Sequence, residues 1–99
     1  MHKIEHIAIA VKSLSTSIPL FEKLLGTPCY KTEQVDSEKV KTAFFKTGEN
    51  KIELLEGMDP EWVVAKFISK KGEGLHHIAF GVENLEESIT ALKIGRAHV

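Results

Sequence analysis

Hydrophobic and polar positions alternate over several short stretches of this chain, and the first stretch predicts a strand over residues 3–11. Side chains in a strand point alternately to two faces. One face of this strand carries His6, Ala8 and Ala10, and the other carries Ile7, Ile9 and Val11. The bulky face is expected to pack on a core, whereas the small residues beside His6 leave room for a ligand.

Nearly the same pattern returns near the other end of the chain. Residues 77–82 read His-Ile-Ala-Phe-Gly-Val, against His-Ile-Ala-Ile-Ala-Val at residues 6–11. A repeat of this kind indicates two copies of one supersecondary unit, and such copies usually pack against each other. In the second copy His77 again stands on the face with the small residues.

A helix is predicted after the first strand, ending near Leu25 with Gly26 as its C-terminal cap. Pro19 is unfavourable in a helix interior, so the helix either starts late, capped by Ser15 or Ser17, or bends at the proline. Its apolar face comprises Leu14, Ile18, Phe21, Leu24 and Leu25.

Three β-like runs follow, over residues 29–35, 40–47 and 51–56. The polar segment 36–39 separates the first two runs, and a hairpin turn is predicted at 48–50. The order up to this point is βαβββ.

The second half of the chain begins with a predicted helix in which Asp59 is the N-cap and Pro60 the first helical residue. The apolar stripe of this helix is Val64, Phe67 and Ile68. After the second copy of the repeat, residues 84–87 form a capping box for a third helix. We therefore divide the chain into a first module (1–57), a connecting helix (58–74) and the start of a second module (75–92). Residues 93–99 break the helical pattern and are interpreted as a non-native tail.

Composition excludes several classes of function. A net charge of −1 gives no support for binding to nucleic acid or an anionic membrane. No apolar run is long enough to span a bilayer and no signal peptide is seen, so a cytoplasmic protein is expected. The single cysteine, Cys29, rules out an internal disulfide and is interpreted as a small packing residue rather than a nucleophile.

Candidate chemistry lies on the open face of the predicted sheet. In the run 51–56, Ile52 and Leu54 share one face, and Glu53 points to the other, where it joins His6 and His77. Two imidazoles and a carboxylate in a cleft suit a divalent first-row metal such as zinc, cobalt, nickel or iron. Strict alternation would turn His76 away from His77, so His76 is interpreted as structural.

The quoted strands, together with residues 65–80, resemble the methylmalonyl-CoA epimerase branch of the glyoxalase/bleomycin-resistance (vicinal oxygen chelate) superfamily. The resemblance covers about residues 2–92. It implies an α+β fold of paired βαβββ modules, of which the second is incomplete here. It also implies that His6, Glu53 and His77 hold a divalent metal (cobalt, nickel, zinc or similar), with Glu53 where some members have glutamine.

The resemblance further implies a CoA thioester as substrate and a metal-stabilised enolate as the route between its two epimers. A fourth ligand, a glutamate that is also an acid/base group, is expected beyond the end of this chain, so no catalytic residue is assigned. Thr42 stands where some members have a second carboxylate, Lys39 replaces a common glycine, and Trp62-Val63 replaces a usual Ser-Pro. A homodimer is a further expectation, because dimers are common in the family.

Three alternatives stay open at this point. One is a glyoxalase I-type lyase, which would use the same kind of metal site to act on a glutathione hemithioacetal. Another is a metal-free module of the same fold that binds small molecules. The last is an inactive fragment, because a half-built second module leaves open sheet edges and an incomplete metal shell.

Overall fold

The computed structural model describes residues 3–81, which form one five-stranded mixed sheet with two α-helices and a short 3-10 helix. This confirms the predicted α+β class and the βαβββ order of the first module. The elements are β1 (Lys3–Ala10), α1 (Leu14–Leu25), β2 (Lys31–Val35), η1 (Asp36–Glu38), β3 (Val40–Thr47), β4 (Asn50–Gly57), α2 (Val63–Lys71) and β5 (Gly74–Gly81).

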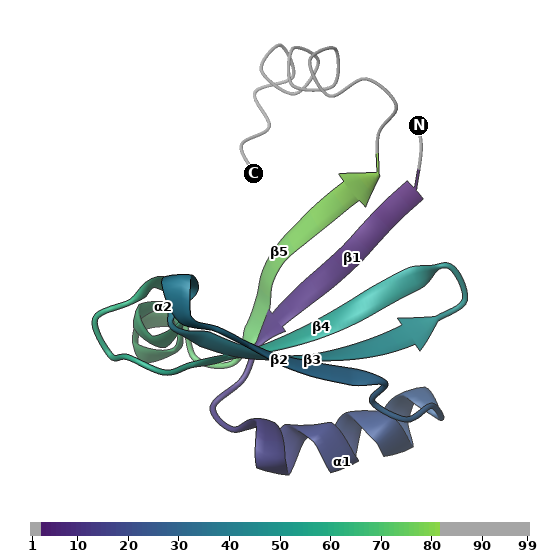
Figure 1. The fold of residues 1–99 in the computed structure, drawn as a ribbon, viewed down its shortest axis with the longest axis horizontal. Coiled ribbons are helices and arrows are strands. Elements are labelled where there is room, and N and C mark those ends of the chain that lie inside the picture. Colours follow the sequence, from purple (N-terminus) through teal and green to yellow (C-terminus); the bar gives the residue numbers. More distant parts are fainter. Residues whose placement is uncertain (1–2, 82–99) are drawn as a thin grey trace, which may run out of the picture.

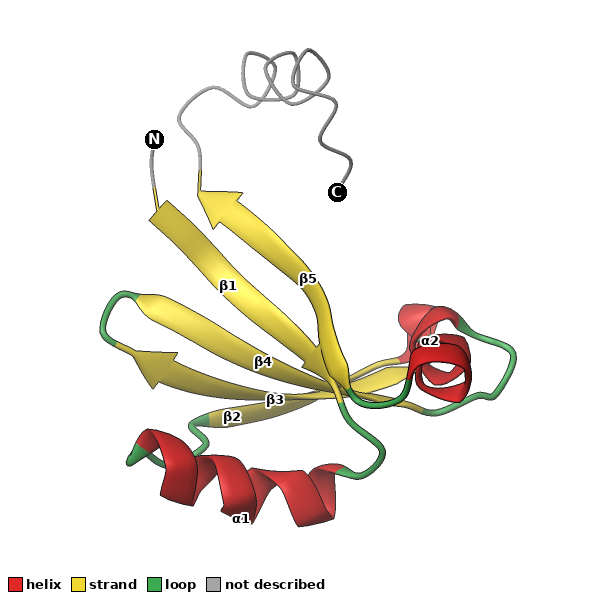
Figure 2. Cartoon of the chain, turned by 180° about the vertical axis from the view of Figure 1, so that it is seen from behind, coloured by secondary structure: helices red, strands yellow, loops and turns green. Residues whose placement is uncertain are grey.

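Strand β1 lies inside the sheet, between the two strands that come latest in the described chain. The strand order is β2-β3-β4-β1-β5, with β1 parallel to β4 and antiparallel to β5 (Figure 1). The two copies of the repeat are therefore neighbouring strands, as the sequence predicted. Figure 2 shows the same arrangement from behind, with the strands converging near α2 and spreading apart toward their other ends.

The two helices pack on opposite faces of the sheet. On one face Leu54 and Phe45, both 0% exposed, belong to the cluster that contacts α1 through its predicted apolar stripe. On the other face Leu55 belongs to a cluster that includes Val64 of α2. Leu24 was predicted to face the core, but it is 71% exposed, because it lies off the stripe that meets the sheet.

Helix α1 begins at Leu14 and contains Pro19, so of the two predicted alternatives the late start is wrong. Ser13, not Ser15 or Ser17, is the N-cap, and its hydroxyl accepts a hydrogen bond from the Thr16 amide at 3.4 Å. The Leu14 amide donates to the Glu56 carboxylate at 2.7 Å, so an acidic side chain from β4 satisfies another free amide of the first turn. Glu56 thus faces away from Glu53, as predicted, toward α1.

Helix α2 begins later than predicted. Its N-cap is Trp62, and the predicted cap Asp59 instead closes a turn before the helix. The Asp59 carboxylate accepts from the Glu61 amide at 2.9 Å, and the Asp59 carbonyl accepts from the Trp62 amide at 3.0 Å. The local hydrogen bonds that favour Asp59 as a cap are thus used in a turn instead.

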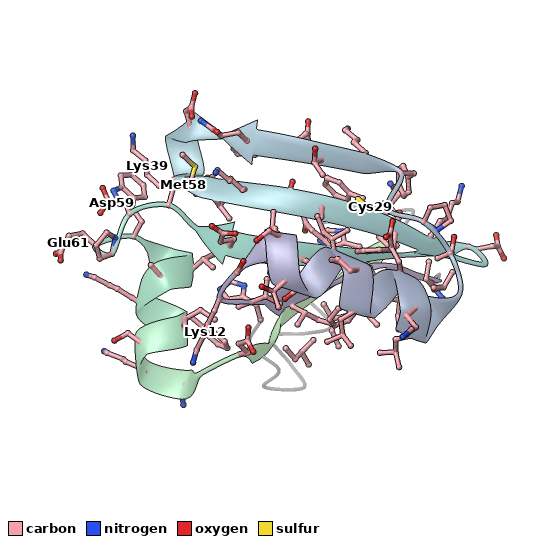
Figure 3. The ribbon with its side chains drawn as sticks, turned by 90° about the horizontal axis from the view of Figure 1, so that it is seen from below. Lys12, Cys29, Lys39, Met58, Asp59 and Glu61 are labelled. Atoms are coloured by element: carbon pink, nitrogen blue, oxygen red, sulfur yellow. The ribbon has the colours of Figure 1, made fainter. Side chains whose placement is uncertain are left out.

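The segment before α2 is tied to the turn between η1 and β3. Lys39 has φ 52 and ψ 51, the left-handed region that favours glycine, at a position where the resemblance leads one to expect glycine. The Met58 amide donates to the Lys39 carbonyl at 2.8 Å, and Figure 3 shows these residues beside Asp59 at one end of the sheet.

The third helix, the capping box at 84–87 and the tail at 93–99 lie outside the described residues, so those interpretations stay predictions. The division into modules likewise stays a prediction. Within the described part of the chain, no helix is long and apolar enough to cross a membrane.

Candidate metal centre

The three residues predicted to bind a metal surround one small residue of β1. In the register of the sheet, Ala8 pairs with Glu53 on β4 and with His77 on β5. Paired residues share a face, and His6 lies two positions before Ala8 on the same strand, so all three polar side chains emerge on one face. The predicted alternation is confirmed at these three positions.

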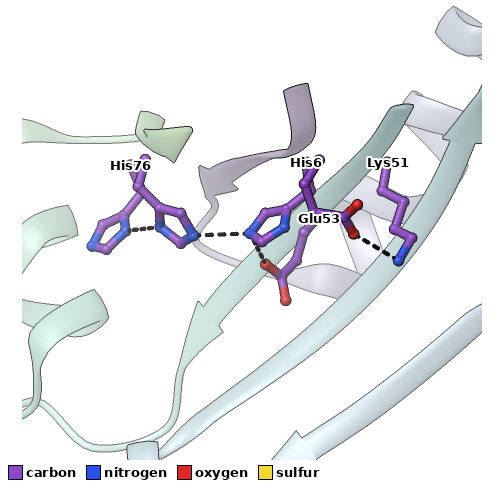
Figure 4. A network of polar contacts seen from close by, with 6 residues as sticks. His6, Lys51, Glu53 and His76 are labelled. Carbon is purple, nitrogen blue, oxygen red and sulfur yellow. Dashed lines mark hydrogen bonds and ion pairs between the residues drawn. The ribbon is translucent and has the colours of Figure 1, made fainter. Parts of the chain in front are cut away.

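The donor atoms converge (Figure 4). The His6 Nε2 and His77 Nε2 atoms are 3.2 Å apart, and the His6 Nε2 is 3.6 Å from the Glu53 Oε1. One donor atom from each residue lies within 4.8 Å of the others. Two nitrogens bound to one ion at about 2.0–2.1 Å would be about 2.9–3.4 Å apart at angles of 90–110°. The histidine pair therefore already has the spacing of two ligands on one metal.

The electrostatics of Glu53 favour a positively charged occupant. Burial raises the pKa of the Glu53 carboxyl above its ordinary value, and the charge of Glu33 raises it further, while His6 lowers it. A half-buried carboxylate without sufficient positive charge nearby is costly. A cation between Glu53 and the two imidazoles would remove that cost.

The surroundings of His77 favour the neutral form of its imidazole, the form that binds metals. Burial lowers its pKa, and positive charge on His76 or His6 would lower it further. A neutral imidazole keeps one nitrogen lone pair free for coordination. The residues present therefore fit a divalent ion in both donor chemistry and spacing.

A pocket of about 280 Å³ opens beside this cluster. Glu53 and His77 contribute to its wall, so a molecule bound in the pocket would reach the donor atoms. Most of the remaining wall is aliphatic and comes from β3, β4, α2 and the segment before η1. Its other lining residues are Val35, Glu38, Val40, Thr42, Leu55, Val63, Val64 and His76.

His76 is placed differently from the prediction. It was expected to face away from His77, but it lines the same pocket, and its Nδ1 lies 2.8 Å from the Nδ1 of His77. The reason is a β-bulge: Ala8 pairs with His77 while Ile9 pairs with Leu75, which leaves His76 as an extra residue on β5. A bulge breaks the alternation of side chains and re-aims one of them.

Two contributors to the pocket had no clear signal in the sequence. Val63, where the resemblance leads one to expect proline, is 61% exposed and lines the pocket from the start of α2. Thr42 stands where the resemblance implies a carboxylate in some members. It is 3% exposed, and its hydroxyl donates a hydrogen bond to the Glu33 carbonyl at 3.5 Å. Of the departures noted in the sequence, Thr42 and Val63 thus lie on the pocket wall, whereas Lys39 and Trp62 are not among its lining residues.

The chain is similar in sequence to several known proteins. The chain is 41% identical over 92 residues to an uncharacterized protein, YqjC, from Bacillus subtilis, covering 93% of this chain and 66% of that protein. It is 29% identical over 92 residues to human mitochondrial methylmalonyl-CoA epimerase, covering 92% of this chain and 52% of the enzyme. The chain thus spans about half to two thirds of the length of these curated relatives.

A solved structure shows the same fold. The methylmalonyl-CoA epimerase of Streptomyces coelicolor, determined in complex with 2-nitronate-propionyl-CoA, superimposes with a TM-score of 0.80 at 27% identity, covering 100% of this chain and 73% of that one. A family model described as Glyoxalase/Bleomycin resistance protein/Dioxygenase superfamily matches residues 5–99. With the fold, the repeat strands and the matching family model in agreement, the chain belongs to the glyoxalase/bleomycin-resistance/dioxygenase superfamily.

Proposed function

We propose that the protein is a divalent-metal-dependent epimerase that interconverts the two epimers of methylmalonyl-CoA. The observation that carries the proposal is the convergence of His6, Glu53 and His77, whose donor atoms lie within 4.8 Å of one another. The similarity to methylmalonyl-CoA epimerases supports the choice of substrate.

The proposed metal would be held by His6, Glu53 and His77, with zinc, cobalt and nickel as candidates. When bound, a divalent ion supplies a Lewis acid that draws electron density from the carbonyl oxygens of a malonyl thioester and so acidifies the carbon between them. Glu53 contributes negative charge to the site, and the two imidazoles contribute neutral donors.

The pocket beside the cluster would receive the acyl part of the substrate. Its aliphatic walls, including Val40, Leu55 and Val64, suit a methyl-bearing carbon and exclude water from it. Epimerisation also needs a proton removed from one face of that carbon and returned to the other. Thr42 carries a hydroxyl that does not ionise near neutral pH, so it cannot replace the carboxylate found in some members.

The test is proton exchange with solvent. The full-length protein, loaded with Co²⁺, is incubated with one epimer of methylmalonyl-CoA in D₂O. We expect deuterium at the carbon between the carbonyls and a mixture of both epimers. His6→Ala and His77→Ala should lose bound metal and reduce exchange together, by about 100-fold or more.

Glu49→Gln, on the exposed hairpin turn, is the matched control and should keep both properties. Retention of metal and exchange by either histidine variant would contradict the ligand assignment. Turnover of the glutathione hemithioacetal of methylglyoxal, without exchange of the thioester, would favour the glyoxalase I-type alternative. Ligand binding that needs no metal would favour a binding module.

A further inference from the structure

We propose that His76 is a positioning residue for the metal centre: its Nδ1 accepts a hydrogen bond from the Nδ1–H of His77 and so turns the Nε2 of His77 toward His6 and Glu53. The proposal concerns a residue that the family resemblance left unassigned. The positioning role of His76 rests on the proposed function, because it requires a metal at this site. The hydrogen bond between His76 and His77 does not depend on that function.

The bulge in β5 is what makes this contact available. Neighbouring residues of a regular strand point to opposite faces and cannot join their side chains. Because His76 is the extra residue between the pairs Ala8–His77 and Ile9–Leu75, its ring is brought to the side of His77. The ring centroids are 5.1 Å apart with planes at 75°, and Figure 4 shows His76 joined to the ring that in turn contacts His6.

The proton positions follow from the two contacts of His77. Its Nε2 lies 3.2 Å from the His6 Nε2, on the side of the metal cluster, and its Nδ1 lies 2.8 Å from the His76 Nδ1. A neutral imidazole has one proton, and the nitrogen that binds a metal must be the one without it. His77 must then carry its proton on Nδ1, so His76 accepts that hydrogen bond and carries its own proton on Nε2.

The His76 ring also packs against α2. The Phe67 ring stands edge-on to the His76 ring, with centroids 5.0 Å apart and planes at 70°. Phe67 itself packs on the buried cluster that includes Val64 and Leu55. The hydrogen bond from His77 to His76 would hold the ring and the tautomer of His77, and the loss of such an outer hydrogen-bond partner typically weakens metal binding about 10–100-fold.

The experiment compares the parent chain with three variants. His76→Phe keeps an aromatic ring against Phe67 but removes the acceptor. His76→Asn keeps an acceptor oxygen near the position of Nδ1 but removes most of the ring. Phe67→Leu removes the ring-to-ring contact and leaves both histidines intact. Circular dichroism first confirms that each variant is folded.

The first readout is the tautomer of His77 in the metal-free protein, from long-range ¹H–¹⁵N NMR of the imidazole rings. We expect the Nδ1–H form in the parent and in His76→Asn, and a shift to the Nε2–H form in His76→Phe. An unchanged Nδ1–H form in His76→Phe would overturn the proposal, and so would an Nε2–H form in the parent.

The second readout is Co²⁺ affinity by titration calorimetry. We expect His76→Phe to bind about 10–100-fold more weakly, and His76→Asn and Phe67→Leu to stay within a few-fold of the parent. Equal affinity of His76→Phe and the parent would overturn the positioning role, as would equal losses in all three variants, which would point to packing. A parent with the expected tautomer but no Co²⁺ binding would instead refute the proposed metal site and leave the hydrogen bond established.

Discussion

At the scale of single residues, Glu53 combines a role in the site with a cost to stability. Its folded-state pKa is raised above the ordinary value of 4.5, chiefly by burial. The folded chain therefore binds this proton more readily than the unfolded chain does. The free energy of unfolding of the metal-free protein then falls as pH rises from about 4.5 through the folded-state pKa, and it stays lower above it.

The first prediction follows from this decrease in the free energy of unfolding as the pH rises. Glu53→Gln should make the metal-free protein more stable than the parent at pH 7, with the difference disappearing as the pH falls below about 4. Urea unfolding with a chelator present, across pH 4–8, measures this. In the same variant Co²⁺ binding should weaken, because an anionic ligand is replaced by a neutral one.

Glu49→Gln, on the exposed hairpin turn, is the matched control and should follow the parent at each pH to within about 0.5 kcal/mol. If Glu53→Gln is less stable than the parent at pH 7, the burial of Glu53 is compensated by contacts other than those described, and the electrostatic account of Glu53 is wrong.

The residue scale also shows how far the sequence could predict the site. His6, Glu53 and His77 could be placed on one face because alternation within each strand is a local property. His76 could not, because its bulge is defined only by the pairing of β5 with β1, and residues far apart in the chain make that pairing. Whether the three donor residues bind a metal stays a prediction.

At the scale of elements, Gly57 sets the distance between β4 and α2. A Cβ added to Gly57 would lie 2.7 Å from the Ala65 nitrogen and 2.8 Å from the Ala65 Cβ. Contacts this short cannot be accommodated without movement, and one of the atoms belongs to the helix backbone. A side chain at residue 57 would therefore push α2 away from the sheet.

We predict that Gly57→Ala lowers the free energy of unfolding by about 1–3 kcal/mol. Because α2 carries Phe67, the variant should also change the ring-current shifts of His76. Urea unfolding and histidine NMR measure the two effects. Glu49→Ala, on the exposed turn, should change neither, whereas wild-type stability in Gly57→Ala would show that α2 is loosely placed.

The boundaries of helices and strands were predicted correctly where a single sequence pattern determined them. The bounds of β3 agree with the sequence, and Gly26 ends α1 in the left-handed conformation, with φ 68. The predicted start of α2 was wrong because an aspartate followed by proline suits both a helix N-cap and a turn. The tertiary contact between Met58 and Lys39 lies directly before that turn, and a reading of local sequence does not include it.

At the scale of the whole molecule, the proposed metal joins strands that are distant in sequence. His6 lies on β1, Glu53 on β4 and His77 on β5, and β4 and β5 both pair with β1. The cluster thus exists only when β4, β1 and β5 are assembled side by side. A ligand that binds the folded state and not the unfolded chain stabilises the folded state by mass action.

Co²⁺ at 100 times its dissociation constant should therefore raise the free energy of unfolding by about 2.7 kcal/mol. For a chain of this length that corresponds to an increase in melting temperature of roughly 10–20 °C. Calorimetric melting with and without Co²⁺ measures the effect, and a chelator should reverse it. Co²⁺ should raise the melting temperature of His77→Ala only slightly. This variant keeps the two proposed ligands on the neighbouring strands β1 and β4 and loses the one on β5.

Glu56→Gln distinguishes metal binding from general charge effects. It alters a carboxylate of β4 that lies on the opposite face and accepts a hydrogen bond from α1, so it should lower the starting stability but keep the Co²⁺-induced increase. If Co²⁺ stabilises the parent and His77→Ala equally, the ion is bound elsewhere. The repeat would then explain how β1 and β5 pair, but not what they bind.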